Sequence, residues 1–191
     1  MADSANAPLC LLQERSHHPL LWITGPPGAG KTTLVATFLQ ARKLRAIWYQ
    51  VDAGDADLAT FLYYLGQAAG IAAPRKGTTL PLLMAEHLND LPGFTRRLFR
   101  ELYSRLPTPS ALVLDNYQEV AVESAFHGVI ETALQELPPG SNLIVVSRAE
   151  PPPDFARALA NNNVGHVGWD ELRLTLEETA AISAGKTASM T

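Results

Sequence analysis

The stretch Gly25-Pro26-Pro27-Gly28-Ala29-Gly30-Lys31-Thr32 decides the fold, because it matches the pattern G-x-x-x-x-G-K-[ST] at every fixed position. Glycines let the main chain curl so that successive N–H groups point toward phosphate oxygens. A helix expected to start near Lys31 adds the positive end of its dipole to that anion site. The match predicts a loop that holds the triphosphate of ATP, or of a closely related nucleotide, together with Mg²⁺.

The polar side chains of this loop have separate expected roles. Lys31 is expected to reach the β- and γ-phosphates, Thr32 to offer its hydroxyl to Mg²⁺, and Thr33 to contact the α-phosphate. The alternative is a Gly/Pro-rich turn with an incidental lysine. It is disfavoured because the segment stands between an apolar run and a helical pattern, where a phosphate loop must stand to work. The predicted nucleotide-binding residues are Gly25, Pro26, Pro27, Gly28, Ala29, Gly30, Lys31, Thr32 and Thr33.

Short apolar runs alternate with helical periods along the chain, which is typical of βαβ units around a parallel sheet. The apolar run Leu20–Thr24 ends at the phosphate loop, and a helix is expected over residues 32–41. The sequence therefore predicts an α/β fold of three layers, with a mostly parallel five-stranded sheet and helices on both faces. The other strands are expected at residues 46–51, 111–115, 142–147 and 164–172, and the other helices at residues 57–70, 93–106, 122–137 and 155–160.

A phosphate loop of this kind also needs an acid that positions Mg²⁺ at the end of a buried strand. Asp115 follows three apolar residues and is predicted to be that acid. Alone, an aspartate in this place would be interpreted as a cap or turn residue, but the loop upstream favours the metal role. Thr32 and Asp115 are therefore the predicted Mg²⁺ ligands.

Asn116 stands where many ATPases of this type carry a second acid that activates the attacking water. An amide can orient water but cannot accept its proton near neutral pH. Glu119 is the nearest carboxylate that could replace the acid, although it could equally begin a solvent-facing helix. Fast hydrolysis is not expected from these residues.

Arg148 follows the predicted strand 142–147, at the end that faces the ligand crevice in a parallel sheet. A guanidinium there could contact the γ-phosphate and sense its presence. The alternative is an exposed arginine paired with Glu150. The residues predicted to take part in the chemistry are Lys31, Asp115, Asn116, Glu119 and Arg148.

The remaining polar clusters are predicted to lie outside the chemistry. Asp52, Asp55 and Asp57 are expected to form a turn and a helix N-cap. For His17 and His18 we expect a loop position near the base side of the nucleotide, or no role. Solvent-facing positions are expected for Arg42, Lys43 and Arg45 at a helix end, and for Arg96, Arg97, Arg100 and Arg105 along the helix 93–106.

Composition narrows the class of protein. The 191 residues suit one domain, and a net charge of −4 provides no global basic field for nucleic acid. No apolar stretch approaches the roughly 20 residues of a membrane helix. The single cysteine, Cys10, supports neither a disulfide framework nor a cysteine metal site and fits a reducing cytoplasm. We expect a cytoplasmic protein without direct nucleic-acid or membrane contacts.

The expected domain organisation is simple. Residues 1–8 are predicted as a flexible N-terminus, residues 9–182 as the P-loop NTPase domain, and residues 183–191 as a flexible tail that begins a following domain. A loop is expected at residues 73–79, and a capping box of Thr175 and Glu178 predicts a final helix.

The ordered segments GPPGAGKTT, WYQVDAGDAD, LVLDNYQEV, IVVSRAEPP and LRLTLEE resemble the STAND class of P-loop NTPases, specifically the MalT-like nucleotide-binding domains of bacterial transcriptional regulators. The resemblance covers about residues 8–182 and implies the ASCE form of the fold, in which a strand is inserted between the P-loop strand and the Asp115 strand. The predicted order, with residues 46–51 and two helices between those strands, agrees with that form.

The resemblance also implies a preference for ATP and a switch whose ADP and ATP states control self-association, or contacts with other domains of a longer regulator. Our leading hypothesis is such a switch with slow or absent hydrolysis, at most a low-turnover ATPase. One alternative is a small-molecule kinase, for which Arg96, Arg97 and Arg100 would have to form the lid. The other is a nucleotide-binding module without turnover, which Asn116 favours.

Overall fold

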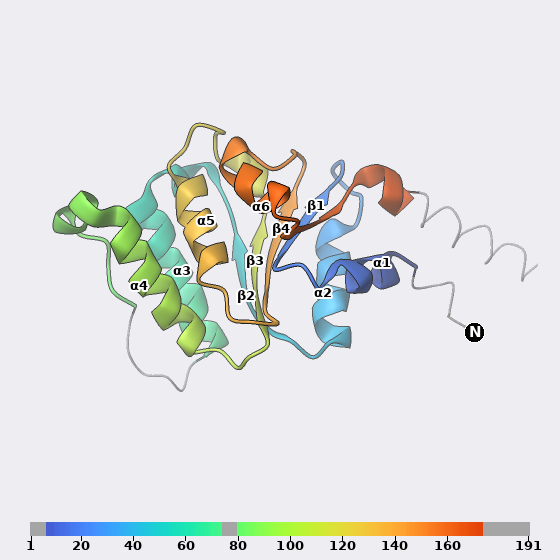
Figure 1. Ribbon diagram of the computed structural model, residues 1–191, viewed down its shortest axis with the longest axis horizontal. Coiled ribbons are helices and arrows are strands. Elements are labelled where there is room, and N and C mark those ends of the chain that lie inside the picture. Colours follow the sequence, from blue (N-terminus) through green and yellow to red (C-terminus); the bar gives the residue numbers. More distant parts are fainter. Residues whose placement is uncertain (1–6, 74–79, 174–191) are drawn as a thin grey trace, which may run out of the picture.

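The computed structural model describes residues 7–73 and 80–173, and in these residues five strands form one parallel sheet (Figure 1). The strands follow the order β2-β3-β4-β1-β5 across the sheet. This confirms the predicted α/β fold with a five-stranded parallel sheet. The strands are β1 (Leu20–Thr24), β2 (Arg45–Gln50), β3 (Ser110–Asp115), β4 (Asn142–Ser147) and β5 (Val164–Val167).

The inserted strand of the ASCE form is β4, which pairs with β1 on one side and with β3 on the other. Residues 46–51, which come between those strands along the chain, instead contribute to β2 at the edge of the sheet. Order along the chain does not set order across the sheet, because a parallel connection crosses over and can skip a position. The carboxyl ends of β1, β4 and β3 therefore lie side by side, and they lead into the phosphate loop, Arg148 and Asn116.

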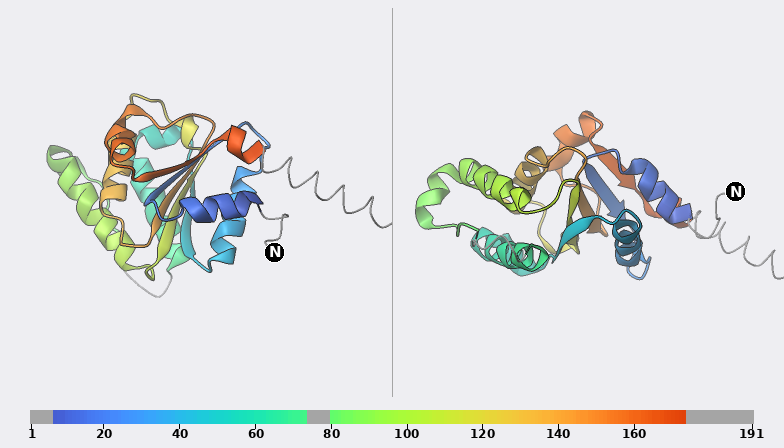
Figure 2. Two further views of the ribbon diagram at one scale, coloured as in Figure 1. Left: turned by 45° about the vertical axis from the view of Figure 1, so that its right-hand side comes forward. Right: turned by 90° about the horizontal axis from the view of Figure 1, so that it is seen from below.

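Helices cover both faces of the sheet and complete the three layers (Figures 1 and 2). In β1, Leu20 and Trp22 are buried in one apolar cluster, while Leu21 and Ile23 are buried in the other. Burial on both faces explains why this strand is a continuous apolar run. None of the described helices is long and apolar enough to cross a membrane. One face is covered by α1 (Ala7–Arg15) and α2 (Lys31–Ala41), and the other by α3 (Leu58–Ala72), α4 (Leu91–Ser104) and α5 (Phe126–Gln135), while α6 (Ala156–Ala160) follows β4.

Two of these helices differ from the sequence predictions. α5 begins at Phe126, and Val122, the first apolar position of the predicted helix, precedes it and is 56% exposed. An apolar period alone does not mark where a helix begins, since a loop residue can continue the period by chance. α1 was not predicted, and it starts within the segment 1–8 that was expected to be a flexible N-terminus.

The last strand is also shorter than predicted. β5 ends at Val167, and residues 169–173 are helical. Glu171 accepts a hydrogen bond from the main-chain N–H of Gly168 at 3.2 Å, and this contact favours a helix start over a continued strand. The capping box of Thr175 and Glu178 lies outside the described residues, as does the predicted loop except for residue 73.

The three aspartates after β2 form the predicted turn and cap. The Asp52 side chain caps the short 3-10 helix that follows it, and the Asp57 side chain caps α3. Asp55 is buried and accepts a hydrogen bond from the Tyr49 hydroxyl at 2.6 Å. All three carboxylates therefore stabilise the connection between β2 and α3.

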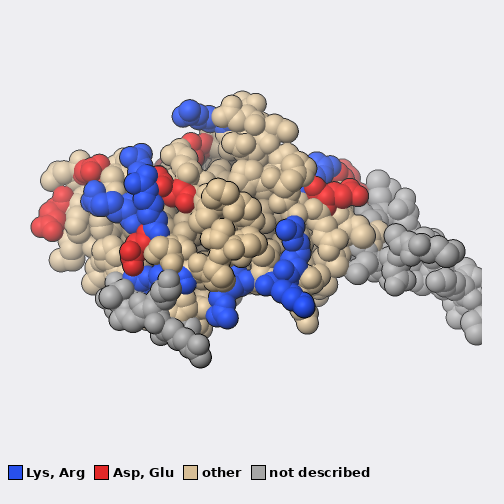
Figure 3. Space-filling view, turned by 60° about the horizontal axis from the view of Figure 1, so that its bottom comes forward, with Lys and Arg blue, Asp and Glu red and all other residues tan. Residues whose placement is uncertain are grey.

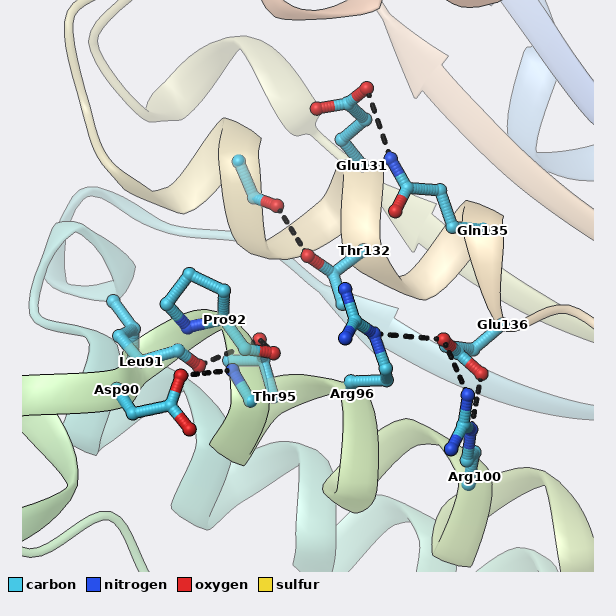
Figure 4. Close-up of polar contacts among 12 residues, drawn as sticks. Asp90, Leu91, Pro92, Thr95, Arg96, Arg100, Glu131, Thr132, Gln135 and Glu136 are labelled. Carbon is cyan, nitrogen blue, oxygen red and sulfur yellow. Dashed lines mark hydrogen bonds and ion pairs between the residues drawn. The ribbon is translucent and has the colours of Figure 1, made fainter.

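Arginines of α4 link that helix to the end of α5 (Figure 4). Arg96 and Arg100 both pair with Glu136, at nitrogen–oxygen distances of 3.2 and 2.6 Å. Arg105 is 8% exposed and pairs with Glu101 at 3.1 Å, so the prediction that it faces water is wrong. Its long side chain is covered by the protein while its charge keeps a carboxylate partner.

The amino ends of the strands form the end of the molecule opposite to the phosphate loop. Lys and Arg side chains gather over this end (Figure 3). Arg42, Lys43 and Arg45 are exposed, as predicted. His17 lines a separate pocket with Arg42, and His18 bonds to the main chain near β5, so both lie at the amino end of β1, opposite to the loop. Of the two alternatives expected for these histidines, the position near the base side of the nucleotide is wrong.

Candidate nucleotide-binding site

The phosphate loop leaves the end of β1 and enters the first turn of α2. Gly28 and Gly30 have φ values of 77° and 75°, in the left-handed region that glycine adopts without strain. Gly30 is the N-cap of α2, and its carbonyl accepts the first helical hydrogen bond from Leu34 at 2.9 Å. A side chain at Gly28 or Gly30 would meet no atom within 4 Å, so open space lies next to the main chain at both positions. The backbone conformation, and not crowding, accounts for both glycines.

Lys31 folds back over the loop that it follows. Its Nζ donates to the carbonyl oxygens of Gly25 at 2.6 Å and Pro26 at 2.9 Å. Burial lowers the pKa of Lys31, the charge of Asp115 opposes that shift, and the charge of Arg148 lowers the pKa further. Polyphosphate oxygens would favour the charged form of this ammonium more strongly than the two neutral carbonyls do.

Thr32 and Asp115 lie in direct contact, close enough to serve as two ligands of one metal ion. Thr32 Oγ1 donates to Asp115 Oδ2 at 3.0 Å, and Asp115 Oδ1 accepts from the main-chain N–H of Asn116 at 3.0 Å. The carboxylate is 7% exposed at the end of β3.

These donors fit Mg²⁺, which keeps several waters and takes one or two protein oxygens together with phosphate oxygens. Among the described residues, no group of three or more histidine, cysteine or acidic side chains could hold a metal by itself. A metal at Thr32 and Asp115 would therefore take its remaining ligands from water and a bound nucleotide.

Asn116 begins a tight turn after β3. Its φ of 61° is left-handed, a conformation that asparagine tolerates better than most residues. The turn that follows is a 3-10 helix, η5 (Tyr117–Glu119). Because Asn116 rotates the chain in this way, Gln118 lines the pocket above the loop and Glu119 does not. Gln118 was not among the predicted site residues, although it follows Asp115 by only three positions.

Arg148 lines the same pocket from the end of β4. Its main-chain N–H donates to Gln118 Oε1 at 3.0 Å, and its Nη2 lies 3.5 Å from Glu119 Oε1. Glu150, which was the alternative partner, pairs with His166 at 3.1 Å. The turn after β3 therefore contacts Arg148 through two neighbouring side chains.

A pocket of about 470 Å³ unites these groups at the carboxyl ends of β3 and β4. A parallel sheet binds ligands at this end, and the volume lies in the range of small-molecule sites. Most of the predicted site residues line it, while Gly25, Pro26 and Glu119 do not. The lining residues are Pro27, Gly28, Ala29, Gly30, Lys31, Thr32, Thr33, Asp115, Asn116, Gln118, Val146 and Arg148.

The profile of a known protein family, described as an AAA domain, matches residues 14–151. That segment contains the phosphate loop, Asp115 and Arg148. The chain belongs to the AAA domain family. In this chain the AAA domain has the strand order β2-β3-β4-β1-β5, and its phosphate loop follows β1.

The chain is also similar to curated MalT regulators, the group whose nucleotide-binding domains its motifs resemble. The chain is 30% identical over 176 residues to the HTH-type transcriptional regulator MalT of Vibrio campbellii, a match that covers 90% of this chain and 19% of the regulator. It is 29% identical over 175 residues to MalT of Cronobacter sakazakii, covering 89% of this chain and again 19% of the regulator. The chain thus spans about a fifth of the length of these relatives.

A solved structure shares the fold. The chain aligns with a protein from Pyrococcus horikoshii with a TM-score of 0.51 and 20% sequence identity. That protein is a signal transduction ATPase with numerous domains (STAND) and carries a tetratricopeptide repeat sensor. The match covers 83% of this chain and 22% of that protein.

Proposed function

We propose that this domain binds ATP with Mg²⁺ and acts as a nucleotide-dependent switch in a longer transcriptional regulator, with slow or no ATP hydrolysis. The observation that carries the proposal is the 3.0 Å contact between Thr32 Oγ1 and Asp115 Oδ2 beside the phosphate loop. Similarity to the MalT regulators supports the regulatory context. In that context the domain would be cytoplasmic, its partners would be other domains or a second copy, and DNA or membrane contacts would belong elsewhere.

Each side chain then has one task. The main-chain amides of the loop and the Lys31 ammonium bind the β- and γ-phosphates, and Thr33 contacts the α-phosphate. Thr32 and Asp115 hold Mg²⁺, which when bound neutralises charge on the phosphates. Arg148 contacts the γ-phosphate and so distinguishes ATP from ADP.

Slow hydrolysis follows from the polar groups near the γ-phosphate position. Asn116 and Gln118 line the pocket, and amides orient water without accepting its proton. Asp115 is the one carboxylate among the lining residues, and both of its oxygens accept hydrogen bonds. Glu119 pairs with Arg148 instead of lining the pocket. None of these groups is placed to act as an efficient general base.

Calorimetry on Lys31→Ala tests the binding site. The substitution should abolish measurable Mg²⁺–ATP binding, because it removes the charge that crosses the loop. Arg97→Ala is the matched control, since it removes one positive charge from an exposed position on α4. Unchanged affinity in Lys31→Ala would refute the site assignment.

Single-turnover hydrolysis distinguishes a slow ATPase from a module without turnover. The proposal is compatible with a low wild-type rate and a faster Asn116→Asp variant, because the new carboxylate can accept a proton. Hydrolysis by Asn116→Asp alone would favour the binding module. A kinase would instead consume ATP only with an acceptor, and the pairing of Arg96 and Arg100 with Glu136 argues against an arginine lid.

A further inference from the structure

Arg148 and Glu119 form an ion pair beside the pocket. Glu119 Oε1 lies 3.5 Å from Arg148 Nη2, and it also accepts a hydrogen bond from Gln118 Nε2 at 3.0 Å. Arg148 lines the pocket, whereas Glu119 does not. The guanidinium that is proposed to contact the γ-phosphate therefore has a protein partner just outside the pocket.

The position of Glu119 relative to Arg148 is fixed by the turn η5. Gln118 Oε1 accepts the Arg148 main-chain N–H at 3.0 Å, which ties the turn to the start of the loop after β4. Below the turn, Tyr117 is 2% exposed and its hydroxyl lies 2.9 Å from Nδ1 of the buried His127. A buried ring and two hydrogen bonds thus hold Glu119 within reach of the guanidinium.

The ion pair is weak enough to exchange. The side chains of Arg148 and Glu119 are 52% and 41% exposed, and ion pairs at such exposure contribute little free energy. Phosphate oxygens offer the guanidinium bidentate, charge-assisted hydrogen bonds that are stronger.

We propose that Glu119 is a specificity-determining residue, which holds Arg148 when no γ-phosphate is present and thereby weakens ATP binding relative to ADP binding. Arg148 exchanges the Glu119 carboxylate for γ-phosphate oxygens when ATP binds, and keeps the carboxylate when ADP binds. Breaking the pair is then a cost of ATP binding alone. This inference rests on the proposed function, because it requires Arg148 to contact the γ-phosphate.

Calorimetry on Glu119→Gln with Mg²⁺–ATP and Mg²⁺–ADP tests the inference. Release of an exposed ion pair should lower the ATP Kd about two- to fivefold and leave the ADP Kd unchanged. The control is Glu123→Gln, which makes the same charge change at an exposed position beyond the turn. An equal gain for ATP in the control would assign the effect to general electrostatics and overturn the inference.

Arg148→Gln separates failure of the inference from failure of the proposed function. It should remove the preference for ATP over ADP, and Glu119→Gln in that background should then have no effect on the ATP Kd. A lost preference in Arg148→Gln, combined with no change in Glu119→Gln, would overturn the role of Glu119 and keep the γ-phosphate contact. An unchanged preference in Arg148→Gln would overturn both.

Discussion

Replacing Gly30 with alanine tests whether the loop depends on its left-handed backbone. Gly30 has a φ of 75°, is the N-cap of α2, and has no atom within 4 Å of the place a Cβ would take. The substitution therefore adds no clash with the rest of the protein, and its cost to folding comes from holding alanine at positive φ. The same substitution at Gly70, near the end of α3, has equal space and no positive φ.

The two substitutions should change the free energy of unfolding in opposite directions. Alanine at a left-handed position costs about 1–2 kcal/mol, so Gly30→Ala should lower stability by that amount if the loop keeps its shape. If the loop relaxes instead, the same free energy should appear as a roughly 5- to 30-fold weaker Mg²⁺–ATP Kd. Gly70→Ala should raise stability by up to about 1 kcal/mol, because alanine restricts the unfolded chain and favours helix.

Urea unfolding gives the free energies, and calorimetry gives the Kd. Both variants change one hydrogen to a methyl group at an open position, so the Gly70 variant controls for the substitution itself. A Gly30→Ala protein that equals wild type in both stability and ATP affinity would show that the loop does not depend on its left-handed backbone.

Three further results are expected from the described contacts. Glu136→Gln should lower the free energy of unfolding by about 0.5–1 kcal/mol in urea titrations at low salt, and less at high salt, because it removes the charge shared by Arg96 and Arg100. Tyr117→Phe should cost about 1–2 kcal/mol in the same assay, since Nδ1 of the buried His127 loses its hydrogen-bond partner while Nε2 keeps the Ala121 carbonyl, and an equal stability would contradict the Tyr117–His127 bond. ATP affinity, followed by calorimetry across a pH series, should fall as the pH rises through the Lys31 pKa, which burial moves below 10.5, because the ammonium is the binding form; an affinity that stays constant over that range would contradict this role of Lys31.

The central layer of the fold could be predicted from sequence because its signals are local. The runs Leu20–Thr24 and Asn142–Ser147 were predicted with the bounds that they have in the structure. Both are continuous apolar segments that end where the chain must turn, at Gly25 in one case and at the exposed Arg148 in the other. Thr32 and Asp115, which were predicted to serve one Mg²⁺ ion, lie in contact, since parallel strands bring their carboxyl ends to one edge.

The strand order and the turn after β3 depend on three-dimensional geometry that the spacing of residues along the sequence does not reveal. Nothing in the order of elements placed β4 between β1 and β3, because crossovers decide that order. The left-handed Asn116 turns the chain so that Gln118, and not Glu119, lines the pocket. The partner of Arg148 was missed for the same reason, since Glu119 is distant in sequence and near only after the turn forms.

The Mg²⁺ dependence of ATP binding tests most directly whether the loop and Asp115 form one site. Calorimetry of the wild type should show tighter ATP binding with Mg²⁺ than with a chelator, because Thr32 and Asp115 supply oxygens to the ion. Asp115→Asn should keep the Mg²⁺-free affinity and lose the Mg²⁺-dependent gain. An Asp115→Asn protein that keeps the full gain, or a wild type that binds ATP equally well without Mg²⁺, would contradict the account.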